Sequence, residues 1–168
     1  MKVRGFLGLS VLLSLFSGSV VLADEIDGFQ LGMSTAKVRQ LAVEKGYTFS
    51  KPTKSSDRWI TYVLSVPHGG QYLPITLSFC DTTLSSVSLT RPSSLHEIAS
   101  TIRDWKSAYG EPEVLPTIQY PDGKQYSGIE FRWPGEDNIR RDITISEYGQ
   151  QQTEIEFGYS YIKHPCRP

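Results

Sequence analysis

Four carboxylates near the C-terminal end have the types and spacing that acid–base chemistry on sugars requires. Glu130, Asp142, Glu154 and Glu156 fall at alternate positions of three segments that are typical of strands. Because successive side chains of a strand point to opposite faces, we expect all four on one face of a sheet. Paired carboxylates on such a face can hydrolyse a glycosidic bond as proton donor and nucleophile.

Three arginines favour a simpler interpretation of the same face. Arg132, Arg140 and Arg141 are interspersed with the carboxylates, and we expect them to lie among them. Cross-strand ion pairs on a solvated sheet face account for this mixture without any catalysis. A glycan hydrolase therefore remains an alternative interpretation.

Other catalytic and metal-binding patterns are missing from the sequence. His68, His96 and His164 each lack a second His, Cys or Glu at the spacing of a zinc site, and His96 fits a helix-capping turn. The sequence has neither a Gly-x-Ser-x-Gly elbow nor a glycine loop for phosphate. We therefore expect no enzyme, no cofactor and no metal.

Aromatic residues are the second candidate signal, since Tyr and Trp dominate protein–protein hot spots. Trp59, Tyr120 and Tyr126 fall on the predicted outer face or in loops. Together with Glu130 and Arg132 they are our candidate contacts with a partner protein.

The first 23 residues have the layout of a cleaved secretory signal peptide. Lys2 and Arg4 precede an apolar stretch, and Val21-Leu22-Ala23 places small residues at the −3 and −1 sites before acidic Asp24. The apolar stretch is short for a membrane span, and a lipid anchor would need Cys where Asp24 stands. We expect a periplasmic protein of residues 24–168, without an integral membrane segment.

Composition and charge agree with an exported globular protein. The 168 residues carry 17 Lys and Arg against 18 Asp and Glu, and without Lys2 and Arg4 the count becomes 15 against 18. This balance argues against nucleic acid as a partner. Another envelope or secreted protein is the expected partner, and the sequence leaves the oligomeric state open.

The two cysteines, Cys80 and Cys166, allow a single intramolecular pairing. In an oxidising compartment this predicts a disulfide that ties the tail to a mid-chain strand. A metal or catalytic thiol is the alternative.

Periodicity predicts the elements that position these residues. One helix begins after the N-cap Ser34, and a second begins at Ser94, where Glu97 completes a capping box. Strands are predicted at 58–66, 72–80, 84–90, 127–133, 139–147 and 153–161, and the proline-containing segment 111–125 is predicted as a loop. The order helix plus three strands thus occurs twice.

Part of this pattern resembles a known family. The segments Phe-Gln-Leu-Gly-Met-Ser at 29–34, Trp-Ile-Thr-Tyr at 59–62, Leu-Ser-Phe at 77–79 and Leu-Ser-Ser-Val at 84–87 are similar to the BamE-type β-clam. The tandem order resembles the β-lactamase inhibitor protein fold. The resemblance covers most of 28–90 and implies a periplasmic binding module without enzymatic activity.

From these observations we expect an α+β fold. Two tandem units, each a helix plus a three-stranded antiparallel sheet, would span about 28–91 and 93–163 and pack as one compact domain. The expected function is protein binding, as an inhibitor or immunity-type protein. An envelope assembly or structural factor of the outer membrane is the alternative, beside the hydrolase.

Overall fold

The computed structural model describes residues 25–54, 56–119, 126–135, 137–148, 152–163 and 166. The signal peptide predicted at 1–23 and the candidate contact Tyr120 lie outside these residues. In chain order the elements are β1 (Glu25–Ile26), β2 (Phe29–Gln30), α1 (Thr35–Glu44), β3 (Thr48–Phe49), β4 (Thr53–Lys54), β5 (Trp59–His68), β6 (Gln71–Cys80), β7 (Thr83–Pro92), α2 (Leu95–Tyr109), β8 (Glu113–Gln119), β9 (Tyr126–Pro134), β10 (Ile139–Tyr148) and β11 (Gln152–Tyr161).

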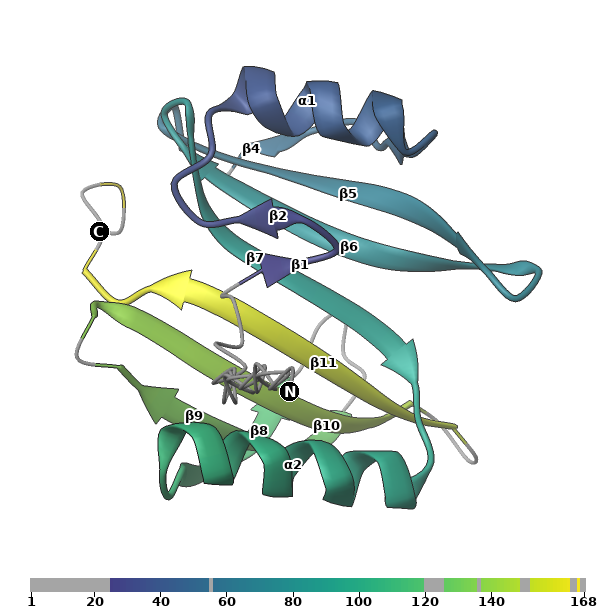
Figure 1. Cartoon of the computed structure of the whole chain (residues 1–168), viewed down its shortest axis with the longest axis vertical. Coiled ribbons are helices and arrows are strands. Elements are labelled where there is room, and N and C mark those ends of the chain that lie inside the picture. The colour runs from purple at the N-terminus through teal and green to yellow at the C-terminus, as the bar shows by residue number, and fades with distance from the viewer. Residues whose placement is uncertain are drawn as a thin grey trace, which may run out of the picture.

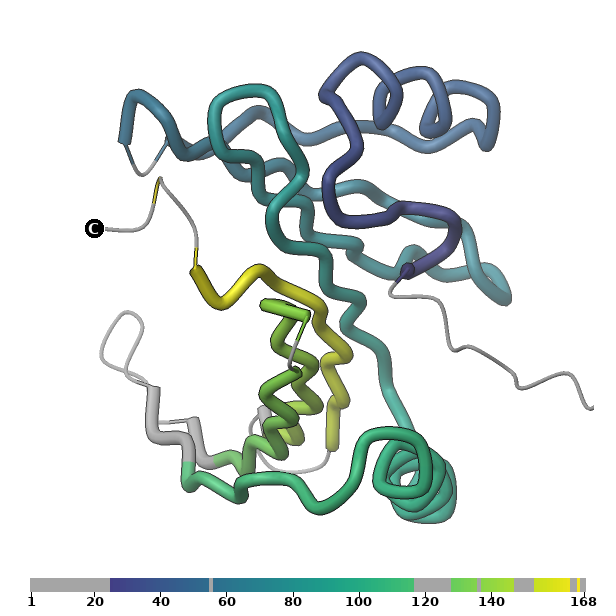
Figure 2. Tube along the Cα trace, turned by 60° about the vertical axis from the view of Figure 1, so that its left-hand side comes forward, coloured from purple at the N-terminus to yellow at the C-terminus, as the bar shows by residue number. Residues whose placement is uncertain are grey.

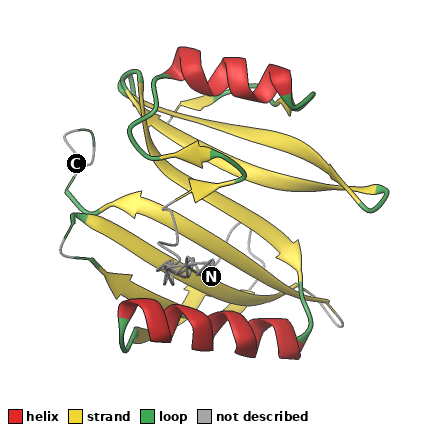
Figure 3. Ribbon diagram, in the orientation of Figure 1, coloured by secondary structure: helices red, strands yellow, loops and turns green. Residues whose placement is uncertain are grey.

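Most of the described chain forms one antiparallel sheet of nine strands (Figures 1 and 3). The strand order is β3-β5-β6-β7-β11-β10-β9-β8, and the short β4 also pairs with β5. The two halves of the chain meet where β7 pairs with β11, which places Ser86 opposite Ser160 and Thr90 opposite Glu156.

The predicted fold class, two tandem units of a helix plus a three-stranded sheet, is wrong. The described residues are mostly antiparallel sheet with two helices, and the sheet runs without a break through both halves. Alternating hydrophobicity identifies single strands but does not show which edges pair, so it missed the β7–β11 ladder. The division into repeats at about 28–91 and 93–163 stays a prediction.

The segment 111–125, predicted as a loop, contains the edge strand β8. The prolines of this segment were the reason for predicting a loop from the sequence. Pro116 is nevertheless compatible with β8, because this strand pairs on one side only, with β9. An edge strand tolerates a residue without a backbone N–H.

Both predicted helix starts are confirmed. The Ser34 hydroxyl accepts a hydrogen bond from Lys37 N at 3.3 Å, ahead of α1. Ahead of α2, Ser94 and Glu97 form the reciprocal capping box. Gly110 ends α2 with a φ of +84°, a left-handed value that favours glycine.

One face of the sheet carries the hydrophobic core. The two helices and the β1–β2 hairpin lie on the same side of the sheet, as the two views in Figures 1 and 2 show. Buried residues of α1, α2 and the hairpin pack with the inward strand residues Leu64, Ile75, Leu77, Val87, Ile143 and Ile155. Within the described residues, no helix is both long and apolar enough to span a membrane.

Aromatic packing fixes α2 on the second half of the sheet. The Trp105 ring lies 5.4 Å from Trp133, 5.9 Å from Tyr109 and 5.5 Å from Tyr159, centroid to centroid. Trp133 Nε1 donates a hydrogen bond to the Gly110 carbonyl at 2.8 Å, which satisfies its polar edge inside the core.

Candidate functional site

The opposite side of the sheet, which we call the open face, carries the residues that alternate with the core positions. No helix or strand in the described part of the chain packs against it. Its members from β5, β6, β7, β11, β10 and β9 include Thr61, Val63, Thr76, Ser78, Ser86, Ser88, Thr90, Glu156, Gly158, Ser160, Arg140, Asp142, Thr144, Glu130 and Arg132.

Small hydroxyl side chains occupy the open face of β5, β6 and β7. The hydroxyls of Thr61 and Ser78 lie 2.9 Å apart in one hydrogen bond. Next to them, at the β7–β11 seam, Ser160 is only 4% exposed, and its hydroxyl has no hydrogen-bond partner in the described residues. A buried hydroxyl without a hydrogen-bond partner is uncommon in folded proteins.

Charged side chains occupy the open face of β8 to β11. Arg132 donates to both carboxylate oxygens of Glu130, with Nε to Oε1 at 2.9 Å and Nη2 to Oε2 at 3.1 Å. Its Nη1 lies 3.8 Å from Glu113 on β8. One rung away, Arg140 Nε donates to Asp142 Oδ1 at 3.2 Å. The arginines are therefore held by intramolecular pairs.

Asp142 is the most unusual group on this face, because its carboxylate is packed onto the backbone of the neighbouring strand. A Cβ built on Gly158 would lie only 2.5 Å from Asp142 Oδ2, so a larger residue at position 158 would require the carboxylate to move. Burial raises the pKa of Asp142; Arg140 opposes this rise, and the charges of Glu130 and Glu156 add to it. A carboxyl with such a raised pKa is a functional-site candidate.

The carboxylate cluster predicted from sequence is only partly brought together. Glu130 and Glu156 both lie opposite Thr144, which places them on either side of β10 and next to Asp142. Glu154 lies one rung further along, opposite Ser146. Acid–base chemistry would therefore depend on Asp142, with Glu130 already occupied by Arg132.

Arg141 was predicted among these carboxylates, and this prediction is wrong. Strand alternation turns its side chain to the core face, where it is 6% exposed. There its Nη2 bonds Asp137 Oδ2 at 2.7 Å, and its guanidinium lies 4.6 Å from the Tyr109 ring centroid. These hydrogen bonds from Arg141 lower the pKa of Asp137. Beside this pair lies an open pocket of about 470 Å³, lined by Tyr109, Trp133, Pro134, Gly135, Asp137 and Arg141.

The candidate partner contacts are spread across the open face. Trp59 is half-buried at the start of β5, opposite Cys80, whereas Glu130 and Arg132 lie on β9. Four strands separate these positions, which corresponds to about 24 Å at a strand spacing of about 4.8 Å. Tyr126 lies in β9, but its side chain is outside the described part of the structure.

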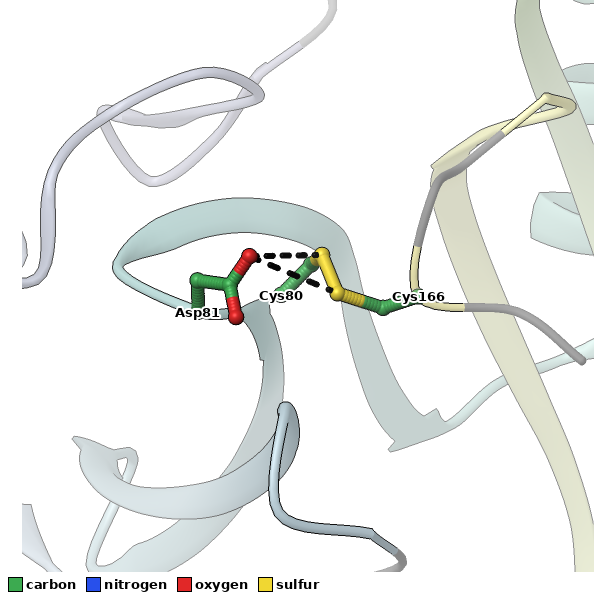
Figure 4. A group of neighbouring side chains, drawn as sticks. All are labelled: Cys80, Asp81 and Cys166. Carbon is green, nitrogen blue, oxygen red and sulfur yellow. Dashed lines mark hydrogen bonds between the residues drawn. A yellow bond between two sulfur atoms is a disulfide. The ribbon is translucent and has the colours of Figure 1, made fainter.

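Cys80 and Cys166 are joined by a disulfide, with their Cα atoms 5.6 Å apart. Beside it, Asp81 occupies the tight β6–β7 turn with a φ of +53°. Figure 4 shows its Oδ2 aimed at both sulfurs, at 3.8 Å from Cys80 Sγ and 3.9 Å from Cys166 Sγ. Sequence reasoning missed Asp81; its position directly after a cysteine was the available signal.

The C-terminal tail has a second attachment in the described residues. The Asn138 side-chain amide donates to the Lys163 carbonyl at 3.2 Å and accepts from Lys163 N at 2.8 Å. The tail is thus fixed both to the β9–β10 turn and to the end of β6. Of the histidines, His68 and His96 are exposed, and His164 lies outside the described residues.

Comparisons with known proteins do not assign the chain to a family or a known fold. No family model matches the chain, no curated protein matches it, and no solved structure matches its fold.

Proposed function

We propose that this protein is an exported, non-enzymatic protein-binding module that binds a partner protein on its open face. The observation that carries the proposal is a broad sheet face with preformed ion pairs and no described element covering it. Within this class, an inhibitor or immunity-type protein is the role that we propose.

The size of the open face supports a protein partner. From β5 to β9 it spans about 24 Å by about 33 Å for strands of ten residues. Small residues in its middle, Ser78, Ser88 and Ser160, are only 8%, 9% and 4% exposed, so a partner would contact mainly the larger side chains around them. A standard protein–protein interface buries about 800 Å² on each partner. Side chains that are already held by intramolecular bonds lose little entropy on binding, which favours affinity.

Charge defines the surface that such a partner should present. The open face of β8 to β11 carries the carboxylates Glu113, Glu130, Asp142, Glu154 and Glu156 against the guanidiniums of Arg132 and Arg140. A partner with a Lys- and Arg-rich surface patch complements this excess of carboxylates. Association should then slow as ionic strength rises.

The first experiment is an affinity pull-down with residues 24–168 from periplasmic and secreted proteins of the source and of competing bacteria. We expect one partner at equal stoichiometry, identified by mass spectrometry. Its capture should weaken with Glu156→Gln and Trp59→Ala on the open face. The matched control is Arg103→Ala on the exposed side of α2. Capture unaffected by both open-face variants would contradict the proposed surface.

Export itself is part of the proposal. Cell fractionation should place the protein in the periplasm, and N-terminal sequencing should begin at Asp24. Recovery with the outer membrane together with assembly proteins would instead support the envelope-factor alternative.

A hydrolase acting on cell-wall glycans is the second candidate function, and the raised pKa of Asp142 is the observation that favours it. The purified protein would release soluble glycan fragments from peptidoglycan, and Asp142→Asn would abolish the release. Absence of release by the wild-type protein removes this candidate.

A further inference from the structure

The disulfide corner contains three potential metal ligands that are far apart in the sequence. Within the described residues, ligand atoms of Cys80, Asp81 and Cys166 all lie within 4.8 Å of one another. Ligand spacing in the sequence does not indicate this group, because Cys166 is 86 residues from Cys80 and lies beside it only in the folded protein. In the oxidised protein the two sulfurs are bonded to each other, so the group is closed to metals.

The position of the Asp81 carboxylate matches the geometry of a tetrahedral zinc site. With Zn–S of about 2.3 Å and Zn–O of about 2.0 Å, tetrahedral angles give an O···S distance of about 3.5 Å and an S···S distance of about 3.8 Å. The observed O···S distances are 3.8 and 3.9 Å. The two sulfurs must therefore move apart, which cleavage of their bond permits, and the carboxylate must approach them by a few tenths of an ångström.

Arg58 holds this carboxylate in place. Its Nε donates to Asp81 Oδ1 at 3.0 Å and its Nη2 to Oδ2 at 2.8 Å, while Asp81 N donates to the Arg58 carbonyl at 2.7 Å. Groups that orient metal ligands in this way are a regular part of metal sites.

Charge and access also fit a divalent ion. Two thiolates and one carboxylate carry three negative charges, which a divalent metal and the Arg58 guanidinium together neutralise. The Asp81 side chain is 52% exposed, so a metal can enter from solvent and water can complete the coordination.

We infer that reduction converts the Cys80–Cys166 disulfide into a binding site for zinc or a similar thiophilic divalent metal, with Asp81 as the third protein ligand. An external dithiol supplies the two electrons and two protons, the S–S bond breaks, and the dithiol leaves as its own disulfide. Metal binding then displaces the two thiol protons to solvent. The C-terminal tail stays anchored to the β6–β7 turn in either state, by a covalent bond or by the metal.

The test is a cobalt titration of the purified protein before and after reduction with a phosphine under anaerobic conditions. Reduced protein should bind one Co²⁺ with thiolate-to-cobalt charge-transfer absorption, and Zn²⁺ should displace it. Oxidised protein should show no such band. Zn²⁺ should also protect Cys80 and Cys166 of the reduced protein from alkylation.

Two variants separate this site from nonspecific thiol binding. Asp81→Asn keeps both thiols but removes a direct ligand. It should lower the affinity of the reduced protein for Co²⁺ by at least about tenfold, because even the loss of an outer-shell partner costs about 10–100-fold. The matched control, Asp57→Asn in the exposed segment before β5, should leave the affinity unchanged. Circular dichroism reports whether each reduced protein remains folded.

Several results would overturn the inference. These are the absence of a charge-transfer band in the reduced wild type, a stoichiometry other than one, or equal affinities for wild type and Asp81→Asn. Binding by an unfolded reduced chain would give such equal affinities and so counts against the site.

Discussion

Arg140 and Arg141 are neighbours in β10, yet each pairs with an aspartate on a different face of the sheet. Arg141 lies on the core side, bonds Asp137 and packs over Tyr109. Arg140 lies on the open face and pairs with Asp142, whose carboxylate is buried against Gly158. The first pair lowers the pKa of its aspartate, whereas burial leaves the pKa of the second raised. The core-side pair therefore contributes to stability, whereas the open-face pair leaves the charge of Asp142 incompletely compensated.

The largest expected effect comes from breaking the core-side pair. Arg141→Ala removes a cation–π contact, the packing of the aliphatic stem and the hydrogen bonds to Asp137, and should lower the free energy of unfolding by about 2–3 kcal/mol. Urea unfolding measures this loss. The control Arg103→Ala, on the exposed side of α2, should change it by less than about 0.5 kcal/mol. Equal effects of the two substitutions would refute the role assigned to Arg141.

The next effect concerns the backbone beneath Asp142. Gly158→Ala places a methyl group against the carboxylate and should cost about 1–3 kcal/mol, the usual range for overpacking. Adding Asp142→Ala should recover part of this loss, because it removes the atoms that clash. The control Ser88→Ala, opposite Gly158 on β7, should be close to neutral. A double variant no more stable than Gly158→Ala would contradict the proposed contact.

The two aspartates should give opposite pH dependences of stability. The pKa of Asp137 is lower in the folded protein than the ordinary Asp value of about 3.9. Ionised Asp137 therefore stabilises the folded protein above a pH of about 3.9. This contribution is lost as the pH falls through the lowered pKa of the folded state. Asp142 binds its proton more readily when folded, so its effect on stability becomes more favourable as the pH falls through the raised folded pKa.

Chemical unfolding between neutral pH and about pH 3 tests this contrast. Asp137→Asn should make the acid-side decline of stability shallower, and Asp142→Asn should make it steeper. The same direction of change for both variants would show that the two pKa shifts are not opposite.

The smallest effect on stability is expected at Glu156, which lies on the open face beside Asp142. Glu156→Gln should change the free energy of unfolding by less than about 0.5 kcal/mol. If the proposed function holds, the same substitution should slow association with the partner at low salt. Calorimetric or surface-plasmon measurements at two ionic strengths separate the two effects. A large loss of stability would place Glu156 in the folding core instead.

Sequence patterns predicted local features well, because those features depend on neighbouring residues. Ser34 and Ser94 end up as N-caps, and the six long strands lie at the predicted positions to within a few residues. Alternation also placed Glu130, Asp142, Glu154 and Glu156 on one face of the sheet, as the strand register confirms. Arg141 was predicted among the carboxylates because it is charged, although alternation along β10 puts it on the opposite face from Arg140 and Asp142.

Long-range features could not be obtained in the same way. The β7–β11 pairing joins positions such as Ser86 and Ser160, and no local pattern encodes that choice of edge. The placement of Asp142 over Gly158, and of Asp81 beside the disulfide, likewise depends on strand register. These contacts define the candidate sites, so the sequence predicted the surfaces better than the sites on them.

The β7–β11 ladder also has a consequence for folding and assembly. Until β11 is synthesised and pairs, β7 presents an unpaired edge, and such edges template pairing with other chains. Sheets built from distant segments have a high contact order and close slowly. In the folded chain β11 occupies this edge along seven residue pairs, from Glu154–Pro92 to Ser160–Ser86, so the ladder that joins the two halves also protects β7 from pairing with another chain.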